Sequence, residues 1–294
     1  MKKFCCFGSL NIDYVYHLPH FVRPGETLGC TRRDQNAGGK GLNQSCALAH
    51  AGGMVFHAGN IGTDGHFLKE TLIRHGVHTD HLRTVDTPTG HAVIQVDASG
   101  ENCILLFGGA NQCADAAQMQ GVLSCFDTGD VLVLQNEIND IGTLMQLAKQ
   151  RGMQIAFNPS PMDDGIFNLP LDTVDYLFVN ETEGAALSGC DKEDAEGMLA
   201  KLAALYPQTE IILTLGSKGA MVEKNGASCF GAAVKSKVVD TTAAGDTFTG
   251  YYLVARSEGM APGDALRLAN AAASITVSRK GAADSIPMRS EVRW

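Results

Sequence analysis

The feature that most constrains the fold of this chain is a regular alternation of short apolar runs with segments of helical spacing. Such an alternation predicts a mainly parallel sheet covered by helices on both faces, which is a three-layer α/β fold. The predicted strands are residues 4–10, 55–58, 131–134, 155–157, 176–179, 211–215 and 220–223. The predicted helices are residues 46–51, 67–75, 141–151, 194–205, 247–256, a segment from Pro262 and a run at 274–280.

Polar side chains gather where the predicted strands end. Asn11, Gln135, Glu137, Asn180 and Thr214 all fall at or just after such ends. In open parallel sheets, ligands bind beyond the carboxyl ends of the strands. We therefore expect a ligand site at this edge of the sheet.

Two regions do not follow the alternation. Residues 14–30 are extended, with Pro19, Pro24 and Gly25 as interruptions, and residues 89–107 have the pattern of a hairpin that turns at 98–100. No long linker or internal repeat divides the 294 residues. Taken alone, these regions fit a pair of surface hairpins without a partner.

Charge and composition exclude several classes of partner. The formal charge of −9 argues against nucleic acid and anionic membrane. Nine cysteines without a Cys-x-x-Cys pair favour reduced thiols in a cytoplasmic protein. The apolar run after Met1 breaks at Gly8, which is too early for a signal peptide or a membrane span. Because the net charge is negative, a phosphate ligand would have to be bound by local backbone amides and a few cations rather than by a basic surface.

Residues 239–248, VDTTAAGDTF, join an apparent strand to a helix. Small residues at a helix start allow a ligand to approach the backbone, and the free N–H groups there attract phosphate oxygens. Asp246 follows the amides of Ala243, Ala244 and Gly245, where a carboxylate could accept a proton from a hydroxyl. The motif alone fits a helix cap equally well.

Residues 36–45, NAGGKGLNQS, form a second glycine-rich segment. Its amides and Asn43 could hold a polyhydroxy ligand. It is not a Walker A loop, because Asp34 and Gly41 stand where that motif needs Gly and Ser or Thr. Taken alone, the segment is more often a strand-to-helix turn without a ligand.

Taken together, these segments resemble the two signatures of the ribokinase (PfkB-type) family of sugar kinases. Further boxes follow in the family's order, namely GSLNID at 8–13, GNIGTDG at 59–65, TPTG at 87–90, NPSP at 158–161, NETE at 180–183, TLGSKG at 214–219 and RKGA at 279–282. The resemblance implies a single ribokinase-like domain over residues 1–294 with a small β lid at about 12–36 and 88–108. It also implies a homodimer formed through that lid.

The resemblance further implies ATP-dependent phosphorylation of D-ribose at its primary 5-hydroxyl, with Mg²⁺ and a monovalent K⁺ as cofactors. The expected partners are a small sugar and ATP, with no nucleic acid and no membrane. Other kinases of the family, acting on deoxyribose, a ketose or a nucleoside, share the catalytic half and remain alternatives. A sugar- or nucleotide-binding protein without turnover is a third hypothesis, which the intact Asp246 motif disfavours.

The family's site residues carry over onto matching positions of this chain. Asp246 matches the general base, and Ala243, Ala244 and Gly245 match the amides that hold the transferred phosphoryl group. The matching sugar-binding residues are Asn11, Asp13, Gly39, Lys40, Gly41, Asn43 and Glu137, together with Asp246. Asn11 and Asp13 would bind sugar hydroxyls, since a carboxylate accepts two hydroxyl protons well.

The nucleotide and cation sites carry over in the same way. The matching ATP-binding residues are Asn180, Glu183, Thr214, Gly216, Ser217, Lys218, Gly219, Gly245 and Asn270. Glu183 would act on Mg²⁺ through water, although Asn180 and Glu183 also fit an ordinary helix start. The matching K⁺ positions, partly through backbone oxygens, are Asp240, Thr242, Thr276, Arg279, Gly281 and Ser285. A helix end capped by Gly281 would explain part of the same pattern.

Other candidate residues carry less weight. His75, His78 and His81 are spaced by three, but Gly76 makes a regular helix doubtful there, so solvated or hydrogen-bonded histidines are favoured over a metal site. Cys5 and Cys6 stand in an apparent strand and are expected in the core.

Overall fold

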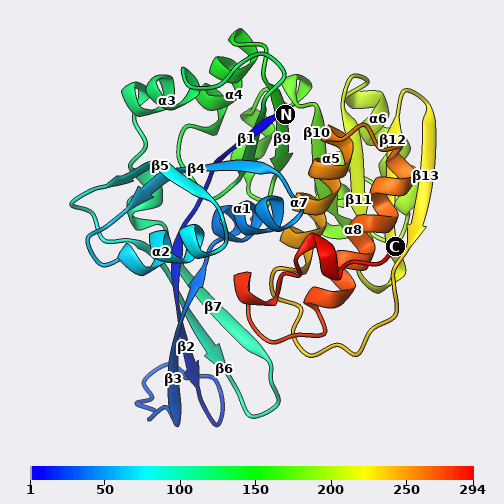
Figure 1. Ribbon diagram of the computed structural model, residues 1–294. Coiled ribbons are helices and arrows are strands. Elements are labelled where there is room, and N and C mark those ends of the chain that lie inside the picture. The colour runs from blue at the N-terminus through cyan, green and yellow to red at the C-terminus, as the bar shows by residue number, and fades with distance from the viewer. Residues whose placement is uncertain (1) are drawn as a thin grey trace.

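The computed structural model describes residues 2–294 and places them around a large sheet (Figure 1). Within these residues the sheet has nine strands, which all run in the same direction except β12, the strand next to one edge, which is antiparallel to β11 and to β13. Their order is β13 (Ala227–Ala232), β12 (Gly219–Lys224), β11 (Glu210–Thr214), β10 (Tyr176–Asn180), β9 (Gln154–Asn158), β8 (Val131–Gln135), β1 (Lys3–Phe7), β4 (Met54–Ile61) and β5 (His78–Thr84). The predicted α/β fold with a mainly parallel sheet is confirmed.

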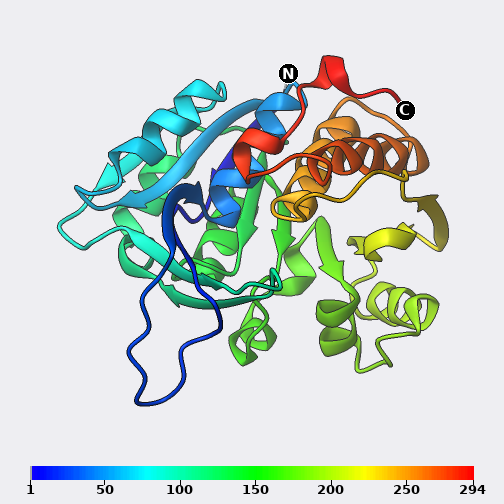
Figure 2. The ribbon, with the colours of Figure 1, turned by 90° about the horizontal axis from the view of Figure 1, so that it is seen from below.

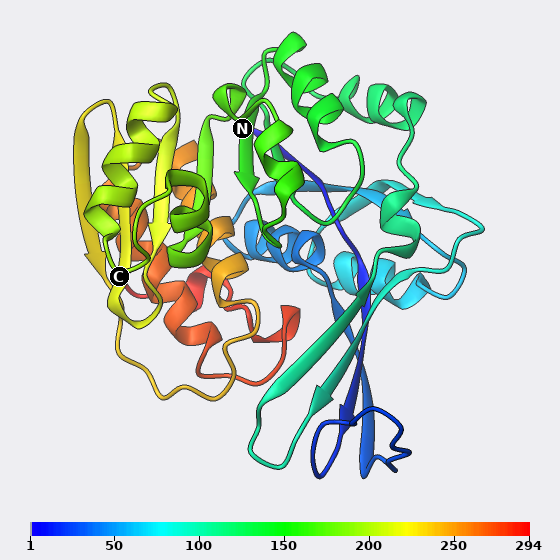
Figure 3. The same ribbon diagram turned by 180° about the vertical axis from the view of Figure 1, so that it is seen from behind.

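Helices cover both faces of this sheet, and each face has its own apolar core. One face carries α1 (Lys40–His50), α2 (His66–Arg74), α7 (Ala244–Ser257) and α8 (Pro262–Thr276). The other carries α3 (Ala116–Leu123), α4 (Ile141–Gln150), α5 (Glu181–Ser188) and α6 (Ala195–Leu205), which are in front when the molecule is seen from behind (Figure 3). The central strands are buried on both sides, which explains their unbroken apolar runs.

A second sheet of four strands projects from the main body as a lid (Figures 1 and 2). Its order is β3 (Arg32–Gly38), β2 (Asn11–His17), β6 (Gly90–Val96) and β7 (Asn102–Phe107). The predicted hairpin with its turn at 98–100 is confirmed as β6 and β7. The extended segment at 14–30 is only partly a strand, because β2 ends at His17 and Pro19 and Pro24 lie in the loop that follows.

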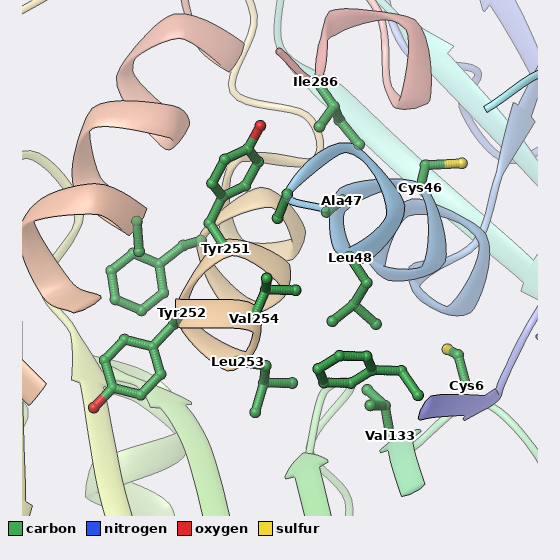
Figure 4. Close-up of a cluster of buried hydrophobic side chains, with 14 of the residues drawn as sticks. Cys6, Cys46, Ala47, Leu48, Val133, Tyr251, Tyr252, Leu253, Val254 and Ile286 are labelled. Atoms are coloured by element: carbon green, nitrogen blue, oxygen red, sulfur yellow. The ribbon is translucent and has the colours of Figure 1, made fainter. Parts of the chain in front are cut away.

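Helix α7 lies at the centre of one core (Figure 4). Tyr251 and Tyr252 are fully buried on it, and their hydroxyls donate hydrogen bonds of 2.6 Å to the Pro287 carbonyl and to Glu210 Oε1, respectively. Helix α1 packs so closely that a Cβ added at Gly250 of α7 would lie 2.6 Å from the Cβ of Ala47. These contacts fix the position of the α7 N-terminus.

Several predicted boundaries were wrong. Helix α1 begins at Lys40 rather than at residue 46, because the turn is confined to Gly39, whose φ is 94°. Strand β1 ends at Phe7 instead of residue 10, and α8 ends at Thr276, so no helix runs through 274–280. Strands β3 and β5 were not predicted, since both are mostly polar and lie at sheet edges.

Candidate active site

A cavity of about 240 Å³ opens at the carboxyl ends of the central strands. It is bounded on one side by the start of α7 and on the other by the ends of β9, β10 and β11. Its lining residues are Lys40, Asn158, Ser160, Phe178, Val179, Asn180, Glu183, Thr214, Thr241, Ala243, Ala244, Gly245, Asp246 and Thr249. The site is therefore at the edge of the sheet where the sequence predicted it.

The α7 N-terminus presents backbone amides to this cavity. Ala243 is the N-cap and has a left-handed φ of 60°, which turns the chain sharply into the helix. The N–H groups of the first helical turn cannot bond within the helix, and the helix dipole adds positive potential there. Ala244 and Gly245 line the cavity at this point. The Ala244 N–H also donates to the Thr241 carbonyl at 3.3 Å, so of these two amides that of Gly245 is the more available to an anionic group.

Asp246, in the first turn of α7, is held by two amides from α1. Asn43 Nδ2 donates to its Oδ2 at 3.1 Å, and Gln44 Nε2 donates to its Oδ1 at 3.0 Å. Burial raises the pKa of Asp246 above its ordinary value, while Lys40 and the two amides oppose that rise. The carboxylate is thus oriented and made more basic, as a proton acceptor requires.

Lys40 is the cation at the centre of this site. Its backbone N–H donates to Glu137 Oε2 at 3.1 Å, and its Nζ lies 3.8 Å from Glu137 Oε1. Burial lowers the pKa of Lys40, but nearby carboxylates, Glu137 and Asp246 foremost, outweigh burial and the pKa is raised. Ser9 Oγ donates to Glu137 Oε2 and accepts from the Gly41 N–H at 3.2 Å, which joins the first box of the sequence to the second.

Asn11 and Asp13 lie on β2, where the lid meets the main body. Asn111 Nδ2 donates to Asn11 Oδ1 at 2.7 Å. Burial, reinforced by Glu137, raises the pKa of Asp13 to about 7, with Lys40 acting in the opposite direction. A Cβ at Gly38 would lie 2.1 Å from Asp13 Oδ2, so the glycine makes room for this carboxylate. The predicted sugar-binding residues therefore converge between lid and sheet.

Asn180 and Glu183 begin helix α5 with a capping box. Asn180 Oδ1 accepts from the N–H groups of Thr182 and Glu183 at 2.9 Å each, and Glu183 Oε2 accepts from the Asn180 N–H at 3.1 Å. The helix-start interpretation is confirmed, and both residues also line the cavity. Burial raises the pKa of Glu183.

Other predicted nucleotide residues lie outside the cavity lining. The turn at Gly216–Lys218 follows β11, and Thr214, at the end of that strand, does line the cavity. Gly219 begins β12 with φ 122°, where a Cβ would lie 2.1 Å from the Gly231 carbonyl oxygen. Asn270 is buried on α8 and donates to the carbonyls of Gly231 and Ala232 at 2.9 and 3.2 Å, so it anchors β13.

The predicted K⁺ positions come together in two adjoining segments. Asp240 Oδ1 accepts from the Thr242 N–H at 2.9 Å, and its Oδ2 accepts from the Gly281 N–H at 3.0 Å. Although burial raises the pKa of Asp240, these hydrogen bonds and others outweigh it, so the pKa is lowered. Thr276 and Ser285, which flank Gly281 in the sequence, are buried. The Arg279 guanidinium donates to Glu291 Oε1 at 2.7 Å.

Across residues 2–294 no group of three or more His, Cys, Asp or Glu side chains is arranged to hold a metal ion. His78 and His81 lie on strand β5, and His75 bonds to His50 at 2.9 Å instead. In the same range, no helix is both long and apolar enough to cross a membrane. All nine cysteines are free thiols, and Cys5 and Cys6 are buried in β1 as predicted.

Several residues of the site were not predicted. Asn158 and Ser160 line the cavity, and the NPSP box at 158–161 was the available signal. Asn111, Ser9 and Gln44 hold other site residues through hydrogen bonds. Ser9 and Gln44 lie inside the segments quoted at 8–13 and 36–45, whereas Asn111 lies in none of them. Their supporting roles had no signal of their own, because their partners lie on distant elements.

A parallel sheet with a β lid, and with a carboxylate beside the open amides of a helix, is the construction of a small-molecule kinase. The sequence matches the pfkB family of carbohydrate kinases over residues 1–289. The chain belongs to this family. It is 34% identical over 300 residues to the ribokinase of Haemophilus influenzae, covering 99% of this chain and 97% of that protein.

Two solved structures show the same likeness in three dimensions. The ribokinase of Cryptococcus neoformans in complex with ADP has a TM-score of 0.88 and 36% identity, covering 99% of this chain and 98% of that chain. The ribokinase of Arabidopsis thaliana complexed with ribose and ATP has a TM-score of 0.87 and 32% identity, covering 98% and 96%. The main sheet, its helices and the lid are thus a ribokinase-like fold.

Proposed function

We propose that this carbohydrate kinase transfers the γ-phosphoryl group of ATP to the 5-hydroxyl of D-ribose. The observation that carries the proposal is the hydrogen bond that Asn43, in the glycine-rich segment, donates to Asp246, which lies beside the α7 amides. Support comes from the relatives, since several proteins similar over nearly the whole chain are named ribokinases and one was solved with ribose and ATP.

In this proposal Asp246 accepts the proton of the sugar hydroxyl as its oxygen attacks the γ-phosphorus. The bond from phosphorus to the bridging oxygen of ADP breaks, and the products are ADP and the sugar phosphate. The amides of Ala243, Ala244 and Gly245 hold the charge on the transferred group, since this reaction needs mainly positioning and charge stabilisation. Asn11, Asp13 and Glu137 bind the remaining hydroxyls.

A magnesium ion fits this site through water rather than direct ligation. Both oxygens of Glu183 already accept hydrogen bonds from Asn180, at 3.0 and 3.1 Å, which leaves lone pairs for bound water. Mg²⁺ keeps much of its water shell and binds substrate phosphates. It would neutralise phosphate charge in a site where Lys40 is already surrounded by carboxylates.

A potassium ion fits the segments around Asp240 and Gly281. In this proposal its ligands are oxygens of these two residues, of Thr242, Thr276 and Ser285, and the Arg279 carbonyl, partly from the backbone, since a large, weakly hydrated cation suits carbonyl ligands. The ion would stabilise the turn that leads into the α7 amides. The nucleotide lies, in this proposal, between the Gly216–Gly219 turn and Asn270.

The lid carries the surface of the proposed dimer. The outer strand β7 of the lid exposes four consecutive apolar residues, Ile104, Leu105, Leu106 and Phe107, with Leu105 72% exposed. This supports a homodimer formed through the lid, by a single kinase domain that spans the chain. The nine free thiols support a cytoplasmic location for the protein.

The test is ADP release across a panel of ribose, deoxyribose, fructose and nucleosides, with Mg²⁺ and with K⁺ present or replaced by tetramethylammonium. Ribose should give the highest kcat/KM, because a pocket built to bind a hydroxyl penalises a sugar that lacks it. A better rate with deoxyribose, a ketose or a nucleoside would assign the chain to that substrate instead. ATP and sugar binding without turnover would leave a binding protein.

A further inference from the structure

A chain of buried amides leads from the main sheet to Asp246. Gln135, the last residue of β8, donates from Nε2 to Gln44 Oε1 at 2.7 Å. Gln44 in turn donates from Nε2 to Asp246 Oδ1 at 3.0 Å. The two glutamines are 0% and 1% exposed, so water does not compete for these hydrogen bonds.

The donor and acceptor directions of these two hydrogen bonds are fixed by the carboxylate of Asp246. An ionised carboxylate can only accept hydrogen bonds, so Gln44 must turn its NH₂ group to Asp246 and its oxygen to Gln135. Gln135 must then donate as well. Each amide therefore has one orientation, and that orientation depends on the charge of Asp246.

Gly8 provides the space for this arrangement. A Cβ at Gly8 would lie 2.4 Å from Gln135 Oε1 and 2.8 Å from the Cα of Gly41. Among the described residues that Gln135 oxygen has no hydrogen-bond partner, although it is buried. A buried polar atom without a partner is costly. The side chain is thus held here by the hydrogen bonds of its nitrogen, which donates to Gln44 Oε1 at 2.7 Å and to the Cys6 Sγ at 3.7 Å.

We propose that Gln44 and Gln135 are positioning residues that aim Asp246 at the attacking hydroxyl of the sugar. The inference rests on the proposed role of Asp246 as the base. Gln44 holds the carboxylate directly, and Gln135 acts through Gln44 without reaching the cavity. Helix α1 thereby supplies the sugar-side residues Lys40 and Asn43 together with the support of the base.

The hydrogen bonds of these two glutamines also influence the pKa of the proposed base, Asp246. The hydrogen bond from Gln44 lowers the pKa of Asp246, together with Lys40 and Asn43, against burial and the charge of Glu137. Other titratable groups face the same residues. The buried Cys6 thiol contacts Gln135, and the charges of Asp13 and Glu183 help to raise the pKa of Lys40. Loss of the Gln44 bond should therefore move the acid limb of the kcat profile to higher pH.

The test compares Gln135→Met with the wild type on its best sugar. We expect a fall in kcat of about two- to tenfold, the equivalent of one neutral hydrogen bond, with little change in either KM. The acid limb of kcat should move upward in pH. Gln118→Met is the matched control, because the half-buried Gln118 also donates from its side-chain amide, to Gly59 O and Asn60 Oδ1, but outside the site.

A second variant, Gln135→Glu, keeps the proposal open to refutation if Gln135→Met folds poorly. A protonated glutamic acid can donate to Gln44 Oε1, whereas the ionised form cannot. The kcat of Gln135→Glu relative to wild type should therefore decline as pH rises. A ratio that is constant with pH, or an unshifted acid limb in folded Gln135→Met, would overturn the proposal.

These outcomes differ from a failure of the proposed function. If Asp246→Asn retains turnover, Asp246 is not the base and the proposed mechanism is wrong. If Asp246→Asn is inactive while both Gln135 variants match the wild type in kcat and pH profile, the base stands and the positioning chain is refuted.

Discussion

The side-chain amide of Asn43 lies 3.1 Å from the carboxylate of Asp246, across 203 residues of sequence. This one hydrogen bond joins the glycine-rich segment near the N-terminus to the helix start near the C-terminus. With Gln44 on the other oxygen, the carboxylate has a fixed direction toward the cavity. The arrangement makes Asp246 the residue whose loss should separate binding from turnover.

We predict that Asp246→Asn abolishes turnover while sugar and ATP binding are largely retained. Loss of a positioned base costs about 10²–10⁴-fold in rate, and more when the base also orients the nucleophile. Steady-state ADP release and calorimetric binding check this. Asp172→Asn, at an exposed carboxylate in the short 3-10 helix Leu171–Thr173, is the control and should behave as wild type. Near-normal turnover in Asp246→Asn would remove the assigned base.

We predict that Asp13→Ala raises the KM for the sugar far more than the KM for ATP. A hydrogen bond to a charged group contributes roughly 1.5–3 kcal/mol, which is about tenfold to more than a hundredfold in affinity. Initial rates with each substrate varied in turn measure the two constants. Equal changes in both would identify Asp13 as a structural residue of the lid.

Sugar affinity should also depend on pH through Asp13. Its pKa in the free protein is raised to about 7, so the carboxyl is mostly protonated below that pH and ionised above it. Because the ionised form accepts hydroxyl protons better, sugar should bind more tightly as pH rises from 6 to 8, and binding near pH 7 should release protons. Calorimetry in buffers of different ionisation enthalpy measures this release, which Asp13→Asn should reduce.

The two buried tyrosines of α7 offer a matched test of stability. Tyr252 donates to the carboxylate of Glu210, whereas Tyr251 donates to a neutral carbonyl. We expect Tyr252→Phe to lower the free energy of unfolding by about 1.5–3 kcal/mol and Tyr251→Phe by about 0.5–1.5 kcal/mol. Urea titrations of both variants measure the difference. A larger loss in Tyr251→Phe would contradict this ranking.

The sequence predicted those parts of the fold that have a strong local pattern. The central strands are apolar throughout because both faces of the sheet are buried, and they were found for that reason. Strands β3 and β5 are polar edge strands, which local periodicity cannot distinguish from loops. The start of α1 was placed six residues late, because glycines are ordinarily poor helix formers. There, Gly41 is required by its close approach to Gly8 and Ser9.

The candidate site was predictable where its residues belong to recognisable boxes. Asp246, Lys40, Glu183 and Thr214 were predicted on this basis, and all four line the cavity. Gln44 and Asn111 act through partners on other elements, and hydrogen bonds of that kind have no local signal.

The packing of α1 on α7 has a consequence for synthesis of the chain on the ribosome. At about 5–20 residues per second, roughly 10–40 s separate the emergence of Asn43 from that of Asp246. During this interval the side of α1 that will meet α7 has no partner, although it carries Asn43, Gln44 and Ala47. The growing chain must keep this surface from non-native contacts until its last helices arrive.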